Sequence, residues 1–197
     1  MNNYRSKDEE IFATWCKEAL AKGHIEAWEY EPETIEIFPK ATITVTKQLK
    51  TKIKYEDKTI LQPLSYTPDF IIEAMLDVFM PSLLNTSMEN SSHYNYFAER
   101  QTYMIDIKPS GYTKFNDSKS FSIVQKALWH SQGIYVNKVR LDKFLAAAWV
   151  PEPVLDKGDL VWCNKDKHGN RRLRSDFSGL KTYKQSEWPF HKFASDL

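Results

Sequence analysis

The sequence predicts an α/β fold in which helices flank a mixed central β-sheet. Three observations support this prediction: a helix pattern near the start of the chain, a series of short strand-like segments after it, and a later helix followed by another strand. This succession favours helices that pack against one sheet. With 197 residues, of which 42% are hydrophobic, the chain is long enough to bury one sizeable core.

The first helix is expected to begin after Ser6 and to end at Gly23. Ser6 is a favoured N-cap residue, and Glu9 stands at the position that closes a capping box. The apolar residues that follow recur at helical spacing: Phe12, Trp15, Cys16, Ala19 and Leu20. A glycine at position 23 favours termination of the helix there.

The remaining elements are predicted from period-two patterns, apolar runs and turn residues. Strands are expected at 34–38, 41–46, 51–55, 59–64 (broken at Pro63), 69–72, 102–108 and 134–139, and helices at about 117–132 and 141–149. We expect a core domain over residues 1–150 with an insertion at about 74–100. A basic, aromatic C-terminal extension is expected over 151–197.

The expected location is the cytoplasm, with no membrane partner. No apolar run approaches the ~18 residues needed to cross a bilayer, and the charged N-terminus does not resemble a signal peptide. Cys16 and Cys163 are the only cysteines and lack the spacing of a metal site. Each is interpreted as a small buried apolar residue.

The net charge of +1 hides two basic stretches. Residues 40–58 contain six lysines against two acidic residues, and residues 165–184 contain seven basic residues against two acidic residues. Such stretches favour a partner with a phosphate backbone over a membrane surface. On charge alone, two solvated faces without a partner stay an open alternative.

A candidate catalytic site combines Asp69 with the Asp106-Ile-Lys108 segment of a predicted strand. Residues i and i+2 of a strand point to the same face, so Asp106 and Lys108 are aimed together. Mg²⁺ prefers carboxylate oxygens and water, and it promotes phosphodiester hydrolysis. Asp69 and Asp106 are therefore candidate Mg²⁺ ligands, and Lys108 is a candidate for stabilising charge or orienting water. We expect Asp69 and Lys108 to lie at a solvent-facing site.

Glu9 is the candidate for a third carboxylate. At about 100° per residue, Glu9 lies roughly 60° from the direction of Phe12 and borders the apolar stripe, whereas Glu10 lies roughly 160° away, toward solvent. Asp8 is geometrically allowed, about 40° to the other side, but lies closer to the helix end. On the later helix, Gln125 or the lysine after it is a further candidate for positioning water or phosphate, unless both are simply solvent-exposed.

Each of these signals alone has an ordinary explanation. Glu9 can simply close a capping box, Asp69 can belong to a turn, and Asp106 with Lys108 can form an ion pair without function. Their joint occurrence, in this order and on these element types, favours a metal-dependent nuclease.

Four segments carry a family resemblance: Tyr4-Arg-Ser-Lys-Asp-Glu9, Ala21-Lys-Gly-His-Ile25, Trp28-Glu-Tyr-Glu31 and Tyr66-Thr-Pro-Asp-Phe70. Together they resemble phage endonuclease I, a family of Holliday-junction resolvases in the PD-(D/E)XK nuclease superfamily. The resemblance implies a restriction-endonuclease-like core in which Glu9, Asp69 and Asp106 bind metal and Lys108 is catalytic. It also implies dependence on Mg²⁺ or Mn²⁺, cleavage of branched DNA, and a homodimer, with the host-cell cytoplasm as the location if a phage encodes the chain. Asp106 departs from the pattern, since the family more often has glutamate there.

Three alternatives stay open. The same site would serve a sequence-directed nuclease of the restriction or transposon-end type, because a fold does not determine its substrate. A nucleic-acid-binding module that does not cut would retain the basic stretches and aromatic residues for base stacking, such as Trp162, Tyr183 and Trp188. A structural protein is the third alternative, and RNA stays open as a substrate.

Overall fold

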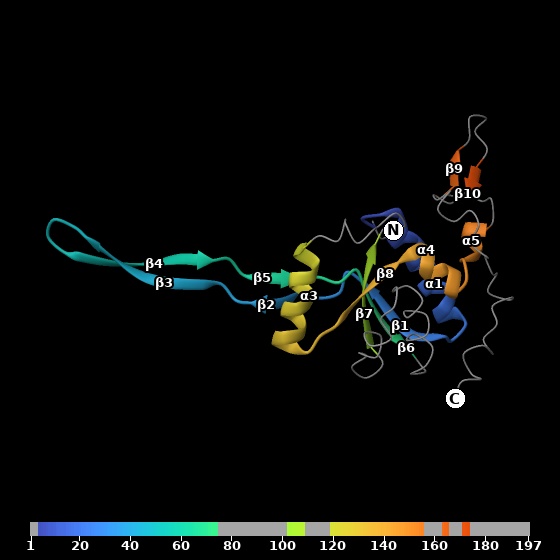
Figure 1. Cartoon of the computed structure of the whole chain (residues 1–197), viewed down its shortest axis with the longest axis horizontal. Coiled ribbons are helices and arrows are strands. Elements are labelled where there is room, and N and C mark those ends of the chain that lie inside the picture. Colours follow the sequence, from blue (N-terminus) through green and yellow to red (C-terminus); the bar gives the residue numbers. More distant parts are fainter. Residues whose placement is uncertain (1–3, 75–101, 109–118, 156–162, 166–170, 174–197) are drawn as a thin grey trace.

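The central sheet of the protein has four strands in the order β1-β6-β7-β8 (Figure 1). The computed structural model describes residues 4–74, 102–108, 119–155, 163–165 and 171–173. Strand β6 runs antiparallel to β1 and to β7, whereas β7 and β8 are parallel, so the sheet is mixed. The predicted fold class is confirmed at this level: a mixed α/β structure with a mixed central sheet and flanking helices.

The bounds of the elements are as follows. The helices are α1 (Lys7–Ala21), α3 (Lys119–Gln132), α4 (Leu141–Ala147) and α5 (Glu152–Leu155). The strands of the central sheet are β1 (Ile25–Tyr30), β6 (Phe70–Ala74), β7 (Thr102–Lys108) and β8 (Val136–Arg140). The other strands pair in twos: β2 (Ile35–Phe38) with β5 (Leu64–Tyr66), β3 (Ala41–Gln48) with β4 (Ile53–Leu61), and β9 (Cys163–Lys165) with β10 (Arg171–Leu173).

Helix α1 begins and ends as its sequence predicts. The Ser6 hydroxyl accepts a hydrogen bond from the Glu9 amide at 3.1 Å, which is the N-cap bond of a capping box. The Glu9 carboxylate reaches back and accepts from the Ser6 hydroxyl at 2.8 Å and from the Arg5 amide at 3.0 Å. At the other end, Gly23 adopts a φ of 71°, a left-handed conformation that costs glycine little. Cys16 on this helix is buried, as expected.

One face of the sheet packs against α1 and α4. Aromatic rings dominate this contact: Phe12 lies 4.9 Å from Phe70 and 5.1 Å from Phe144, and Trp15 lies 5.0 Å from Trp149, measured between ring centroids. Such large side chains contribute most of the apolar area that a small core buries. The cluster continues through Val154, which lies just past the expected end of the core domain.

The opposite face of the sheet packs against α3 and against the paired strands β2 and β5. Helix α3 presents an apolar side to the sheet: Phe121 and Leu128 are buried in this second cluster, and Val124 packs against it. The helix ends before Gly133, which has a φ of 69°. Both faces of the sheet are therefore covered, as in α/β proteins generally.

A two-stranded ribbon extends away from the sheet (Figure 1). It consists of β3 and β4, which continue from β2 and β5. The expected strand at 51–55 is wrong at its start, because the Leu49 amide donates to the Lys52 carbonyl at 2.8 Å and residues 49–52 form the turn. The expected strand at 59–64 is divided between β4 and β5, and the predicted break at Pro63 is confirmed. Strand β1 was not predicted, because Trp28 and its neighbours lack a clear period-two pattern.

The other predicted elements lie close to their expected positions. Strand β7 has the expected bounds, whereas β8 begins and ends slightly later and α4 ends earlier than predicted. The insertion at about 74–100 and most of the 151–197 extension lie outside the described residues. Within the described residues, no helix has the length and apolar character that crossing a membrane requires.

The packing predicts that the core and the ribbon differ in sensitivity to truncation. Phe12→Ala should lower the free energy of unfolding by about 3–5 kcal/mol, because it leaves a cavity among buried rings. Ile53→Ala in the ribbon should change it by no more than about 0.5 kcal/mol, because that side chain is 52% exposed. Urea denaturation of both variants measures the difference, and equal losses would contradict a ribbon that stands apart from the core.

Candidate active site

The site lies where β6 and β7 meet at one end of the sheet. Phe70 is paired with Ile105, so Asp69 lies opposite Asp106 in the antiparallel register. The Asp69 carboxylate accepts a hydrogen bond from the Ile107 amide at 2.7 Å. A side chain thus replaces the backbone partner at the point where strand β6 begins, and this contact holds the two aspartates close together.

The charge of Asp69 is affected by its neighbours. Burial raises its pKa to about 7, and the Asp106 carboxylate is the next largest cause, whereas the hydrogen bond from Ile107 acts in the opposite direction. Glu9 also raises the pKa of Asp69. The three predicted carboxylates therefore share one electrostatic environment, although they come from a helix and two strands.

Lys108 forms an ion pair with Asp106, on the same face of β7, as the strand periodicity predicts. Its ammonium nitrogen lies 4.8 Å from the centroid of the Phe121 ring on α3, within the range of a cation–π contact. The expectation of a solvent-facing site needs correction here, because the Lys108 side chain is only 19% exposed. The first turns of α3 cover it, which the spacing of residues along the strand does not reveal.

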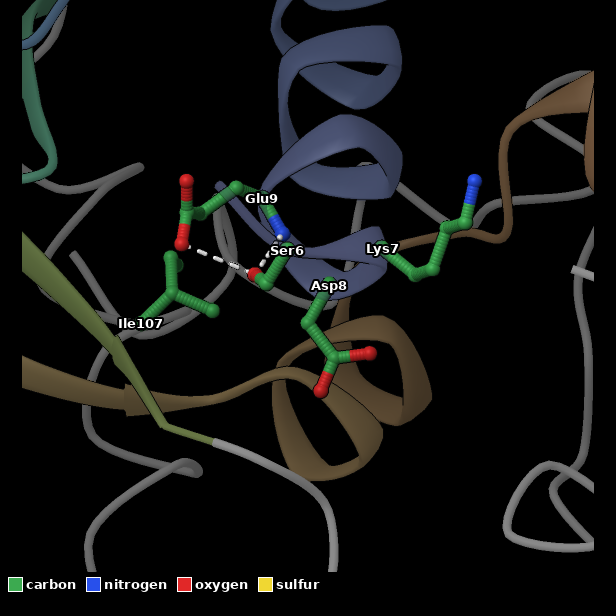
Figure 2. A pocket seen from close by; sticks show the side chains of 5 residues that line it. All are labelled: Ser6, Lys7, Asp8, Glu9 and Ile107. Carbon is green, nitrogen blue, oxygen red and sulfur yellow. Dashed lines mark hydrogen bonds between the residues drawn. The ribbon is translucent and has the colours of Figure 1, made fainter. Parts of the chain in front are cut away.

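Glu9 is buried at the start of α1, beside a pocket of about 320 Å³ (Figure 2). The carboxylate accepts hydrogen bonds from the Arg5 amide at 3.0 Å, the Ser6 hydroxyl at 2.8 Å and the Tyr30 hydroxyl at 2.7 Å. Figure 2 shows the Glu9 side chain beside Ile107, a core residue of β7. The predicted position of Glu9 at the border of the core is therefore confirmed.

The two acids next to Glu9 differ from it in direction and exposure. Asp8 is also buried, but Figure 2 shows its carboxylate pointing away from that of Glu9. Glu10 is partly exposed, and its carboxylate forms an ion pair on the helix surface with the ammonium nitrogen of Lys7, 3.6 Å away. Asp8 and Glu9 thus both line the pocket with Ile107 of β7, but their carboxylates point in different directions.

The fit of the site to a divalent cation rests on the two aspartates. The buried Oδ2 atom of Asp106 is paired with Lys108 and has no hydrogen bond of regular geometry within the described residues. Two neighbouring buried carboxylates repel each other, and a bound cation would relieve this repulsion. However, no group of three or more histidine, cysteine or acidic side chains in the described parts of the chain has metal-binding geometry. The three hydrogen bonds to Glu9 keep its carboxylate engaged with the capping box and Tyr30.

Two further residues beside the aspartates were not predicted. The pKa of Tyr66 is raised, first by burial and then by the charges of Asp106 and Asp69. Lys138 on β8 is the register partner of Asp106, and its ammonium nitrogen lies 5.1 Å from the centroid of the Phe121 ring. The Tyr66-Thr-Pro-Asp segment was a signal for the first. The position of Lys138 two residues after Val136, on the same face of the strand, was a signal for the second.

Gln125 lies on the face of α3 that packs toward the sheet, one turn beyond Phe121. Its side-chain oxygen accepts a hydrogen bond from the Val136 amide at 3.2 Å, at the start of β8. Its role in positioning water or phosphate stays a prediction. Lys126, the other candidate on this helix, is exposed.

Comparison of the chain with protein-family models, with curated proteins and with solved structures finds no match. The class of protein is therefore defined by its own fold and by the residues of the site. The protein has a mixed α/β fold in which two paired aspartates and a lysine lie under a helix, at the end of the central sheet.

The raised pKa predicts that Asp69→Asn changes how stability depends on pH. The folded state raises the pKa to about 7, whereas an unfolded aspartate titrates near about 3.9. Protonated Asp69 therefore contributes its full share to the free energy of unfolding below about pH 4. This contribution is lost as the pH rises through about 7. At about pH 8 the variant should exceed the wild-type free energy of unfolding by at least ~1 kcal/mol.

Urea denaturation between about pH 4 and pH 8 tests this difference. Glu73→Gln is the matched control, because it neutralises an exposed carboxylate on β6 and should follow the wild-type curve. Parallel curves for Asp69→Asn and wild type would refute the proposed repulsion.

Proposed function

We propose that the protein is a metal-dependent nuclease of the PD-(D/E)XK type, which hydrolyses phosphodiester bonds in DNA. One observation carries this proposal: Asp69 and Asp106 lie opposite each other on paired strands, with Lys108 in contact with Asp106. Carboxylates and an ammonium group in this proximity supply the groups that phosphodiester hydrolysis needs.

In this proposal Asp69 and Asp106 hold Mg²⁺, which Mn²⁺ can replace, and Glu9 is the third acid. When bound, the ion supplies Lewis-acid catalysis and lowers the pKa of a coordinated water. Mg²⁺ commonly uses one or two protein carboxylates together with water and substrate phosphate, so two aspartates suffice for binding. The hydrogen bond from the Ile107 amide orients the Asp69 carboxylate toward Asp106.

Lys108 is the proposed catalytic cation. Its ammonium group lies beside Asp106 and against the Phe121 ring, so its position is restricted before substrate binds. From there it can bind a non-bridging phosphate oxygen and stabilise the charge that develops on it. Lys138 lies against the same ring and provides a second positive charge next to the site.

Two further parts of the proposal rest on the resemblance to phage endonuclease I. These are selectivity for four-way or branched DNA, and a homodimer that cuts two strands. A sequence-directed nuclease would use the same residues, and it is distinguished by whether cutting depends on duplex sequence or on branching.

A non-catalytic nucleic-acid-binding module is the second candidate. The observation that favours it is the state of Glu9, whose carboxylate is engaged by three hydrogen-bond donors of the protein itself. Such a protein would bind DNA equally well with or without a divalent cation.

The nuclease proposal predicts that Lys108→Ala abolishes cutting while the fold is retained. Loss of one charge-stabilising group should reduce the cleavage rate at least ~10²-fold. The assay uses end-labelled four-way junction, linear duplex and single-stranded DNA, with Mg²⁺ or with EDTA. The metal-dependent cutting should be strongest on the junction.

Lys143→Ala is the matched control, because it removes an exposed lysine from α4 and should cut like wild type. A second measurement follows the melting temperature, which Mg²⁺ or Mn²⁺ should raise in wild type but not in Asp106→Asn, since only the former retains both ligands. If all three DNAs are bound but none is cut with either metal, the nuclease proposal is wrong and the binding module takes its place.

A further inference from the structure

The outer part of the ribbon carries more positive than negative charge. No acidic residue lies between Glu36 and Glu56, whereas this interval contains five lysines: Lys40, Lys47, Lys50, Lys52 and Lys54. All five are exposed, and four of them lie at or next to the turn formed by residues 49–52. A concentration of positive charge at the end of a projecting element favours contact with a polyanion.

The pairing of the strands increases this charge locally. Lys47 lies directly across the ribbon from Lys54, and like charges in such cross-strand pairs destabilise a hairpin. Lys54 is partly compensated by Glu56, whose carboxylate lies 2.6 Å from its ammonium nitrogen. Phosphate groups bound on both sides of the ribbon would remove the remaining repulsion.

The shape of the ribbon fits one groove of DNA. The major groove of B-form DNA accepts a two-stranded β-ribbon, whereas the deep and narrow major groove of A-form RNA does not admit side chains. Strand β3 has 8 residues, so the β3–β4 ribbon extends roughly 27 Å, which is long enough to cross a groove. Neither apolar cluster of the described residues includes a side chain from 41–61, so this surface is not required for the core.

One face of the ribbon carries groups suited to base edges. Thr42, Thr44, Thr46 and Gln48 occupy alternate positions of β3 and therefore share a face. On this face the Thr44 hydroxyl donates to the carboxylate of Asp57, its cross-strand partner, at 2.8 Å. Tyr55 is the cross-strand partner of Thr46 and is 68% exposed. Threonine and glutamine side chains hydrogen-bond to base edges, while the lysines along the rim contact phosphates.

We propose that the ribbon of β3 and β4 is a DNA-binding arm that enters the major groove of a B-form duplex. The inference rests on the proposed function for the choice of DNA as substrate, and it adds the surface that holds the duplex beside the catalytic site. Lys47, Lys50 and Lys52 contact the phosphates that border the groove.

The test removes three positive charges from the turn region. Lys47→Gln, Lys50→Gln and Lys52→Gln are combined in one variant, and Lys17→Gln, Lys22→Gln and Lys143→Gln in a matched control of equal charge. Binding of a fluorescent linear duplex is measured in EDTA, which prevents cutting, at several salt concentrations between about 50 and 200 mM.

We expect the ribbon variant to bind duplex DNA roughly tenfold or more weakly, and its slope of log K against log salt concentration to fall in magnitude by about 2 to 3. The control should keep more of the wild-type affinity for duplex DNA, and more of the wild-type salt slope, than the ribbon variant does. A shortened ribbon, in which Asn-Gly replaces residues 45–56 and joins Thr44 to Asp57, should show the same loss, because these two residues face each other across the strands.

Several outcomes overturn the inference. Equal losses in the ribbon variant and the control would mean that charge alone matters, wherever it is placed. Binding of duplex RNA as tight as that of duplex DNA would exclude recognition of the B-form groove. If sedimentation shows that only the shortened ribbon changes oligomeric state, with DNA affinity unchanged, then the ribbon joins copies of the chain instead.

The outcome for the arm is separate from the outcome for the nuclease. A ribbon variant that binds weakly, in a protein whose wild type cuts nothing, would support the arm and refute the proposed function. A ribbon variant with wild-type binding, in a protein whose cutting needs Lys108, would do the reverse.

Discussion

The antiparallel pairing of β6 with β7 is the constraint on which the candidate site depends. Once Phe70 pairs with Ile105, Asp69 must lie opposite Asp106, and the Ile107 amide holds it there at 2.7 Å. Two carboxylates are thus kept together at a partly buried position, where their repulsion is strongly unfavourable. The apolar contacts of Phe70 and its neighbours on the opposite face of the sheet stabilise a strand pairing that electrostatics alone would disfavour.

The two sides of the sheet make different contributions to the site. The α1 side supplies a tightly packed aromatic core and positions Glu9 at its edge, next to Ile107. The α3 side supplies Phe121, which lies against both Lys108 and Lys138 and limits the access of water to them. Low exposure to solvent strengthens the attraction between a cation at this position and an incoming phosphate.

The ribbon has the opposite character to the site. It leaves both sides of its outer strands open to solvent, and its base alone is anchored, where Ile37 and Leu64 pack against α3. An isolated hairpin is marginally stable in water, so the outer ribbon depends on its base and on regular cross-strand pairing. Neither apolar cluster of the described residues includes a side chain from 41–61, so the side chains of the ribbon are available for a partner.

The sequence by itself determined most of the elements and the direction of many side chains. The capping box of Ser6 and Glu9, the glycine at the end of α1, and the common face of Asp106 and Lys108 all follow from local periodicity and turn chemistry. Only the tertiary structure decided which of these residues contact each other. The covering of Lys108 by Phe121, the place of Lys138 opposite Asp106, and the separation of the ribbon from the central sheet depend on strand register and helix docking. These involve residues far apart in the chain, whose contacts no local pattern encodes.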